Sequence, residues 1–184
     1  MIRLRSIYLP PWRIDVTLRP RIKLPIPVNV LARTAAAALG AATPPRPASL
    51  AVIFSNDAEL AQLNEQHMGH EGPTDVLSFP MLSPSAFPAH EGQDPQARQA
   101  PTHPFPRPLR GRSHLGDIVI SVERAVDQAR LGRGGQTGTE AWSAADEVLL
   151  LVVHGTLHVC GWDHADPVER DAMRALEREV LKTR

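Results

Sequence analysis

The sequence contains little that would place the protein outside the cell or inside a membrane. It has a single cysteine, Cys160, among 184 residues, and one cysteine cannot close an intramolecular disulfide, which favours a reducing compartment. Its longest apolar run, residues 148–153, is far shorter than the roughly 20 residues needed to cross a bilayer. Pro10 and Pro11 interrupt the N-terminal segment before the apolar core of an export signal could develop. We therefore expect a cytoplasmic protein without a membrane-spanning helix.

An excess of charge of either sign is also missing. The 20 Lys and Arg residues balance the 20 Asp and Glu residues, which excludes a histone-like or strongly basic nucleic-acid coat. Any polyanionic partner must therefore be bound by a local group of cations. The length is close to that of one globular domain, and 42% hydrophobic residues suffice for one core. We predict a single domain over residues 1–184, which excludes a large multidomain enzyme.

Proline, in contrast, is abundant, with 18 residues, about twice the average usage. Seven of these prolines fall between residues 81 and 113. This segment has few branched apolar side chains, so little of it is expected to pack. It lies between two predicted strands, which makes it a loop insertion within the domain and not a linker between two domains.

The rest of the sequence alternates predicted helices and strands. Branched apolar runs predict three strands, at 50–54, 74–79 and 117–121. Helical periodicity and capping residues predict four helices, at 27–42, 56–68, 121–131 and 139–160. A last helix begins at Asp166, followed by Pro167 at its first position. We predict the α+β class, with a small mixed β-sheet and one long buried helix that carries a histidine motif.

That motif, at residues 154–164, contains three histidines. Residues four apart project from the same face of a helix, so His154 and His158 can direct a ring nitrogen at one ion. Gly161 permits the left-handed conformation that ends a helix, which lets His164 return as a third ligand. An isolated buried histidine is usually a hydrogen-bonded core residue, but this order of helix, glycine break and return predicts a metal site. Three imidazoles suit one Zn2+ ion and leave a fourth position open for water.

Three neighbouring side chains could belong to this site, but each has a simpler role. Cys160 follows His158 by two positions, about 200° around the helix, so we expect it to pack in the core. Asp163 and Asp166 could orient the histidines, although aspartates at a helix start are usually caps.

The spacing of the three histidines and Gly161 also matches metzincin zinc proteases, which carry their general base directly after the first histidine. Gly155 occupies that position, so a peptidase is a distant alternative.

The sequence resembles the YbeY family of bacterial endoribonucleases and rRNA maturation factors in three motifs. These are the histidine block at 154–164, Pro-Thr-Asp-Val-Leu-Ser-Phe-Pro at 73–80 and Leu-Gly-Asp-Ile-Val-Ile at 115–120, in the order of the family. The resemblance runs from about residue 24 to the C-terminus, without the proline-rich insertion. It implies an α+β fold, a metal ion, usually taken as zinc, on the three histidines, and cleavage of single-stranded RNA. It also implies 3′-end maturation of 16S rRNA, ribosome quality control, and the small ribosomal subunit and a ribosome-associated GTPase as partners.

The sequence departs from the family just before the central motif. Members have a tyrosine and an arginine where this chain has His67 and Met68, and Glu71 stands for an aspartate. A guanidinium there would bind a phosphate through two hydrogen bonds and stabilise transition-state charge, which a thioether cannot do. This departure favours the alternative of a non-enzymatic ribosome assembly factor, in which the metal only pins the end of the long helix.

The expected mechanism is metal-dependent hydrolysis of an RNA phosphodiester bond, in which the metal polarises a phosphate oxygen and acidifies a water molecule. No general base is identifiable from the sequence, so the catalytic residues are unassigned. His67 and His70 could assist, although histidines before a turn are usually bystanders. Arg107, Arg110 and Arg112 are candidates for phosphate binding, and a solvated loop accounts for them equally well.

Overall fold

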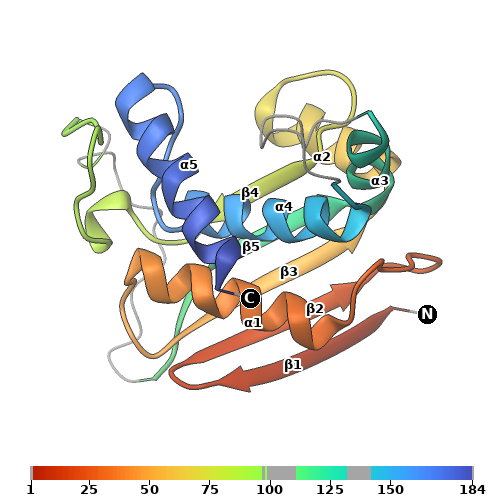
Figure 1. Cartoon of the computed structure of the whole chain (residues 1–184), viewed down its shortest axis with the longest axis horizontal. Coiled ribbons are helices and arrows are strands. Elements are labelled where there is room, and N and C mark those ends of the chain that lie inside the picture. Colours follow the sequence, from red (N-terminus) through yellow and green to blue (C-terminus); the bar gives the residue numbers. More distant parts are fainter. Residues whose placement is uncertain (1, 97, 99–110, 132–141, 184) are drawn as a thin grey trace.

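The computed structural model describes residues 2–96, 98, 111–131 and 142–183, and its centre is a five-stranded sheet in the order β1-β2-β3-β5-β4 (Figure 1). The strands are β1 (Arg3–Leu9), β2 (Trp12–Leu18), β3 (Ala48–Ser55), β4 (Val76–Pro80) and β5 (Ser113–Ser121). The inner strands β2, β3 and β5 are parallel, whereas the edge strands β1 and β4 run antiparallel to their neighbours. The sheet is therefore mixed, as predicted.

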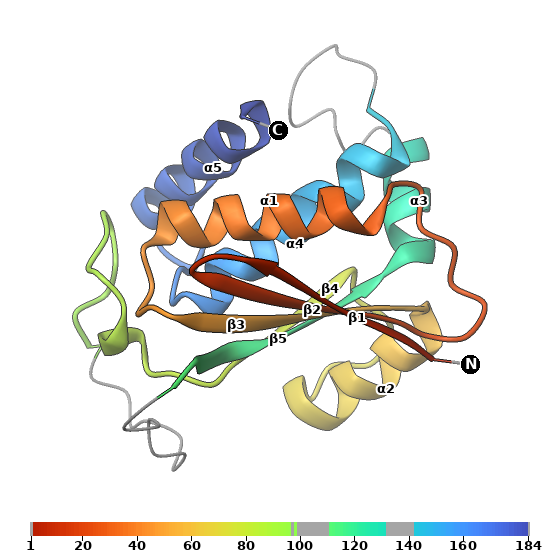
Figure 2. The ribbon, with the colours of Figure 1, turned by 90° about the horizontal axis from the view of Figure 1, so that it is seen from below.

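Helices cover both faces of this sheet. They are α1 (Val28–Ala42), α2 (Asp57–Met68), α3 (Val122–Arg130), α4 (Ala144–Val159) and α5 (Pro167–Lys182), with a short 3₁₀ helix, η1 (Pro84–Ala86). Seen edge-on, α1, α4 and α5 lie on one side of the sheet and α2 lies on the other (Figure 2). The α+β class is thus confirmed. Within the described residues, no helix is both long and apolar enough to cross a membrane.

Strand β5 shows how both faces of the sheet are buried. Ile118 and Ile120 are fully buried in the large core that also contains the apolar side chains of α1 and α4. Val119, between them, packs with Leu60 of α2 in a smaller cluster. Successive residues of a strand point to opposite faces, so a continuous apolar run predicts a sheet covered on both sides, as observed. Most residues of α4 are buried, as the predicted central helix requires.

The sequence patterns do not predict the hairpin that β1 and β2 form. Most of β1 is exposed, with Arg3 and Arg5 alternating along it, so it contains no apolar run that would mark a strand. An edge strand buries little surface, and its hydrogen bonds to β2 leave no periodic signal in the sequence. The N-terminal segment is therefore part of the sheet.

Two elements begin four or more residues away from the predicted positions. Strand β5 begins at Ser113, because it pairs with β3 from Ala48 onwards through polar residues that carry no strand signal. Helix α4 begins at Ala144 and not at 139. Ser143 caps this helix, and it forms a capping box with Asp146, which fixes the first turn. Residues 139–141 lie outside the described residues.

The proline-rich segment packs more than its composition predicts. Phe87 is only 3% exposed and belongs to the main core, with Leu82 packed against it. Arg98 donates hydrogen bonds to the carbonyl oxygen of Phe87 (3.2 Å) and to Oε1 of Gln93 (2.7 Å). The expectation that little of this segment packs is therefore wrong for 81–96. It stays a prediction for residues 99–110, which the structure does not describe.

Candidate metal centre

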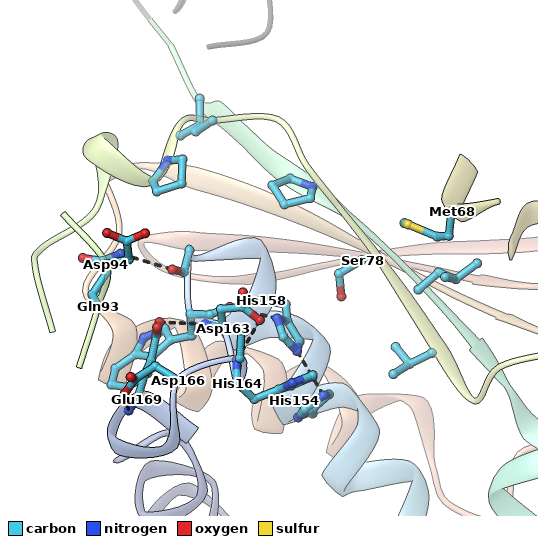
Figure 3. Close-up of a pocket in the computed structure, with 18 of the residues that line it drawn as sticks. Met68, Ser78, Gln93, Asp94, His154, His158, Asp163, His164, Asp166 and Glu169 are labelled. Atoms are coloured by element: carbon cyan, nitrogen blue, oxygen red, sulfur yellow. Dashed lines mark hydrogen bonds between the residues drawn. The ribbon is translucent and has the colours of Figure 1, made fainter. Parts of the chain in front are cut away.

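Helix α4 and the turn after it bring three histidines together (Figure 3). His154 and His158 lie one turn apart on α4, and Gly161 follows the helix with a φ of 88°, in the left-handed region. The chain then turns back, so that His164 faces the other two rings. One potential ligand atom from each histidine lies within 4.8 Å of the others. The predicted cluster therefore exists as a geometric unit that could hold a metal ion.

Hydrogen bonds behind two of the rings fix their orientation. Nδ1 of His154 donates to Oε1 of Glu177 at 2.7 Å, and Nδ1 of His158 donates to the carbonyl oxygen of Trp162 at 2.8 Å. Because a carboxylate and a carbonyl only accept, each neutral ring carries its proton on Nδ1. The two Nε2 atoms lie 3.1 Å apart and present lone pairs to each other. A cation between them would convert this repulsion into ligation, which is the arrangement expected of oriented metal ligands.

The environment of His158 also keeps its ring neutral. Burial, followed by the charges that His154 and His164 carry when protonated, lowers the pKa of His158 to about 4. The carbonyl oxygen of Trp162 and the carboxylate of Asp163 oppose this shift without cancelling it. Since a metal binds the neutral imidazole, His158 is ready to act as a ligand at neutral pH.

The cluster opens onto a cavity of about 1100 Å³, which we call the large cavity. His164 is exposed, whereas His154 and His158 are half-buried, so the rings are accessible from this side. Within the described residues, no further His, Cys, Asp or Glu joins the group of three. Three protein ligands facing a cavity are typical of a metal site that leaves one coordination position for solvent or substrate.

Gly155 is required by the packing of α4 on the sheet. A Cβ atom at this position would lie 2.6 Å from Cγ2 of Ile118 on β5. Ser78 of β4 donates a hydrogen bond to the carbonyl oxygen of Gly155 at 3.2 Å, which marks the same close approach. A side chain here would point into the core and away from the histidines. A general base in the place that metzincin proteases use is therefore sterically excluded.

The three neighbouring candidates do not contact the imidazoles through their side chains. Cys160 is 1% exposed in the core, as predicted, and burial raises the pKa of its thiol to about 12, so it is no thiolate ligand. Asp166 caps α5 by accepting from two backbone N–H groups, also as predicted. The Oδ1 atom of Asp163 accepts from the backbone N–H of His164 at 2.7 Å. The ring-orienting role falls instead to Glu177, which the sequence analysis does not identify.

Residues of α2 lie at the other end of the large cavity. Met68, the last residue of α2, lines this cavity and is 42% exposed, and Figure 3 shows it apart from the histidines, beyond Ser78. The ring of His67 contacts Phe79 edge-on, with centroids 5.3 Å apart. His70 is exposed, and neither His67 nor His70 lines the large cavity. The structure therefore gives these two histidines no part in the site.

The prediction that Arg112 binds phosphate is wrong. Its guanidinium donates from Nη1 to the carbonyl oxygens of Pro11 (2.6 Å) and Ala48 (2.8 Å). These bonds tie the residue before β5 to the turn between β1 and β2 and to the start of β3, so the side chain has a structural role. Arg107 and Arg110 lie outside the described residues.

Part of the proline-rich segment holds the turn that carries His164. The Nε2 atom of His90 lies 2.7 Å from Oε1 of Glu169, and both side chains are almost completely buried. The ring of His90 also stacks on Trp162, with centroids 3.8 Å apart and planes 13° apart. Gln93 donates to the carbonyl oxygen of Gly161 at 3.2 Å. This packing fixes the path of the chain between α4 and α5.

Comparison with known proteins adds a family to this geometry. A family model described as Endoribonuclease YbeY matches residues 26–184. A protein named endoribonuclease YbeY from Beutenbergia cavernae is 38% identical over 138 residues, 74% of this chain and 74% of its own length. One of the same name from Salinispora tropica is 39% identical over 134 residues, 73% of each chain. The solution structure of TM1509 from Thermotoga maritima is 19% identical, with a TM-score of 0.48, and the match covers 92% of this chain and 90% of that one.

Proposed function

Because this chain belongs to the YbeY family of endoribonucleases, we propose that it is a zinc-dependent endoribonuclease that hydrolyses phosphodiester bonds in single-stranded RNA. The observation that carries this proposal is the pair of rings whose Nδ1 protons are engaged by Glu177 and Trp162, which leaves two Nε2 lone pairs 3.1 Å apart beside the large cavity. Three nitrogen ligands with one position left over favour zinc in a catalytic site.

The residues that would hold the ion are His154, His158 and His164. A zinc ion bound there would polarise a phosphate oxygen and acidify a water molecule. The contribution of the protein is to keep the proton of His154 on Nδ1, through Glu177, and to hold the His158 ring neutral through burial. The large cavity would admit a flexible single strand to the histidines. No side chain is assigned as general base.

The same family membership supports the cellular part of the proposal. The chain would act in the 3′-end maturation of 16S rRNA and in ribosome quality control, in the cytoplasm. Its partners would be the small ribosomal subunit and a ribosome-associated GTPase. These statements rest on the family resemblance of the sequence and on no contact within the chain.

A second candidate is a non-enzymatic ribosome assembly factor in which the metal has a structural role. The lining of the large cavity favours it, because Met68 stands where the family has an arginine and no Lys or Arg lines this cavity within the described residues. Against it, the main core is continuous across α1, α4, α5 and the sheet without any contribution from the three histidines. We therefore expect the metal-free protein to be folded.

The test is cleavage of a labelled single-stranded RNA by protein that has been stripped with chelator and then reloaded with zinc. Endoribonuclease activity should disappear with the metal and return with it, while circular dichroism shows a folded chain throughout. His158→Ala should be inactive in both states. Loss of structure on chelation, without cleavage by the zinc-loaded protein, would establish the structural role instead.

A further inference from the structure

A second hollow adjoins the histidines, and Met68 does not line it. It has a volume of about 740 Å³, and His154 and His164 line it together with residues of α4 and α5. We call it the α5 groove. The same two histidines also line the large cavity, so the candidate metal centre lies where the two hollows meet.

Three arginines of α5 line the α5 groove. Arg170, Arg174 and Arg178 are spaced four residues apart, so they lie on one face of the helix with a rise of about 6 Å between neighbours. Arg174 and Arg178 are exposed. Within the described part of the chain these two guanidinium groups form no ion pair, and Arg170 is 3.3 Å from Asp171. The row therefore presents positive charge over about 12 Å, a length in which one strand of a nucleic acid carries several phosphates.

Two of the three carboxylates that line the α5 groove are less accessible than its cations, since Glu147 is 3% and Glu177 is 7% exposed, whereas Arg174 and Arg178 are exposed. Glu177 accepts from His154, and Glu147 accepts from the indole N–H of Trp142 at 2.6 Å. Asp75 accepts from Nε2 of Gln128 at 3.0 Å. The large cavity has the opposite character, since five carboxylates and, within the described residues, no Lys or Arg line it. A polyanion that approaches the histidines is thus attracted from the α5 side.

The α5 groove also offers an apolar surface for bases. Trp142 lines it near Leu150 and Leu181, and the hydrogen bond from its Nε1 to Glu147 restrains the half-buried indole. Stacking of a base on an aromatic ring stabilises single-strand binding with little dependence on sequence. Cations along one wall and an aromatic ring in the same groove are the features that non-specific single-strand binding uses.

We propose that the α5 groove is the binding path of the single-stranded RNA. Arg170, Arg174 and Arg178 contact phosphates of the strand, and a base stacks on Trp142. This inference rests on the proposed function, since it concerns the substrate of the same site. It assigns the phosphate contacts to α5, an element different from α2, which carries the position where the family has its arginine.

The experiment measures binding separately from cleavage. A fluorescein-labelled oligouridylate of about 12 nucleotides, within the range of single-strand site sizes, is titrated in chelator, and the anisotropy is followed at several salt concentrations. For the double variant Arg174→Ala/Arg178→Ala we expect Kd to rise at least tenfold. The slope of log K against log salt should fall by about 1.4, or 0.7 for each lost phosphate contact. Arg174→Lys/Arg178→Lys should keep most of the slope, because the charge is retained.

The matched control removes two exposed helical arginines that lie outside both hollows. Arg33→Ala/Arg130→Ala lowers the net charge equally but changes residues of α1 and α3, so its Kd should stay within about twofold of wild type. Trp142→Leu should weaken binding to the single strand more than binding to a duplex of the same length. Circular dichroism shows whether each variant is folded.

The outcomes separate this inference from the proposed function. If wild type binds and cleaves RNA but the α5 variant keeps its Kd and salt slope, the α5 groove is not the path, and the nuclease assignment stands. If binding depends on α5 but the zinc-loaded protein cuts nothing, the path stands and the nuclease assignment fails. An equal loss in the control variant, equal binding of duplex, or no binding by wild type would each overturn the proposal.

Discussion

The two sides of the histidine cluster differ in charge. The large cavity is lined by five carboxylates and by Met68, and the α5 groove is lined by three arginines together with Asp75 and the buried Glu147 and Glu177. If both proposals hold, the ligands of the cation and the groups that attract a polyanion come from different elements. Helix α4 and its following turn carry the three candidate ligands, while α5 carries the three arginines. Substitutions should therefore change one property without the other.

The most severe test removes one candidate ligand and leaves the lining of the α5 groove unchanged. His158→Ala should weaken zinc binding by more than about 100-fold, beyond the loss typical of outer hydrogen-bond partners, because two oriented Nε2 atoms no longer converge. RNA binding in chelator should not change. Competition with a zinc-binding dye gives the affinity, and His70→Ala, an exposed histidine outside the cluster, is the control. Unchanged zinc affinity would show that the three histidines are not the site.

The next largest effect is expected on the pH dependence of the free energy of unfolding, through the protonation of His158. The pKa of His158 is about 4 in the fold and about 6.5 in an unfolded chain. The unfolded state therefore takes up the proton first, so stability is unaffected above pH 6.5 and is lost as the pH falls from 6.5 to 4. The free energy of unfolding of metal-free protein should fall by roughly 3 kcal/mol more in wild type than in His158→Gln over this range. Parallel urea-unfolding profiles of the two proteins would contradict it.

The position of the histidine cluster could be predicted from the sequence because every step of it is local. His154 and His158 are one helical turn apart, and Gly161 and His164 follow within six residues of the second histidine. Spacing and a left-handed glycine fix the geometry of such a short segment. The buried strands were predictable for a similar reason, since continuous apolar runs indicate a sheet covered on both faces.

The remaining features depend on contacts that are distant in the sequence. Glu177 reaches His154 from the next helix, and Phe87 and His90 pack on residues far along the chain. One signal was available in α5, where Glu169 and Glu177 share the buried face with Met173. A carboxylate in an apolar register needs a buried partner, and a histidine is the partner of each. The sequence does not say which histidine belongs to which carboxylate.

A third test removes the hydrogen-bond acceptor of one candidate ligand, His154. Glu177→Ala should lower zinc affinity by about 10- to 100-fold, because the Nδ1 proton of His154 loses its acceptor and the ring is no longer held. Glu177→Gln should restore most of this loss through its amide oxygen. Glu179→Ala, an exposed carboxylate of the same helix, controls for charge. If Glu177→Ala and Glu179→Ala have the same zinc affinity, the hydrogen bond at 2.7 Å has no role in ligation.

The charge difference between the two hollows can also be reduced by adding a positive charge to the lining of the large cavity. Met68→Arg should raise cleavage of single-stranded RNA about tenfold, equivalent to ~1.4 kcal/mol of transition-state stabilisation, with unchanged zinc content. Position 68 ends α2 and is 42% exposed, so the guanidinium stays solvated and stability should not fall. A folded, zinc-loaded variant no more active than wild type would mean that another group, such as the α5 arginines, already supplies the charge, or that the chain acts by binding RNA alone.

The smallest effect is expected from the part of the proline-rich segment that the structure does not describe. Replacing residues 99–110 by a short Gly-Ser linker should change Tm by no more than about 2 °C, because the cost of loop closure varies slowly with length. His90→Ala is the contrasting variant, since it removes a buried partner of Glu169 at 2.7 Å and the ring stacked on Trp162. It should cost roughly 1–3 kcal/mol and weaken zinc binding through the turn that carries His164. If the linker variant loses as much stability as His90→Ala, residues 99–110 are as much a part of the fold as 81–96. If instead only His90→Ala responds, the insertion has one half that supports the metal centre and one half that the domain can lose.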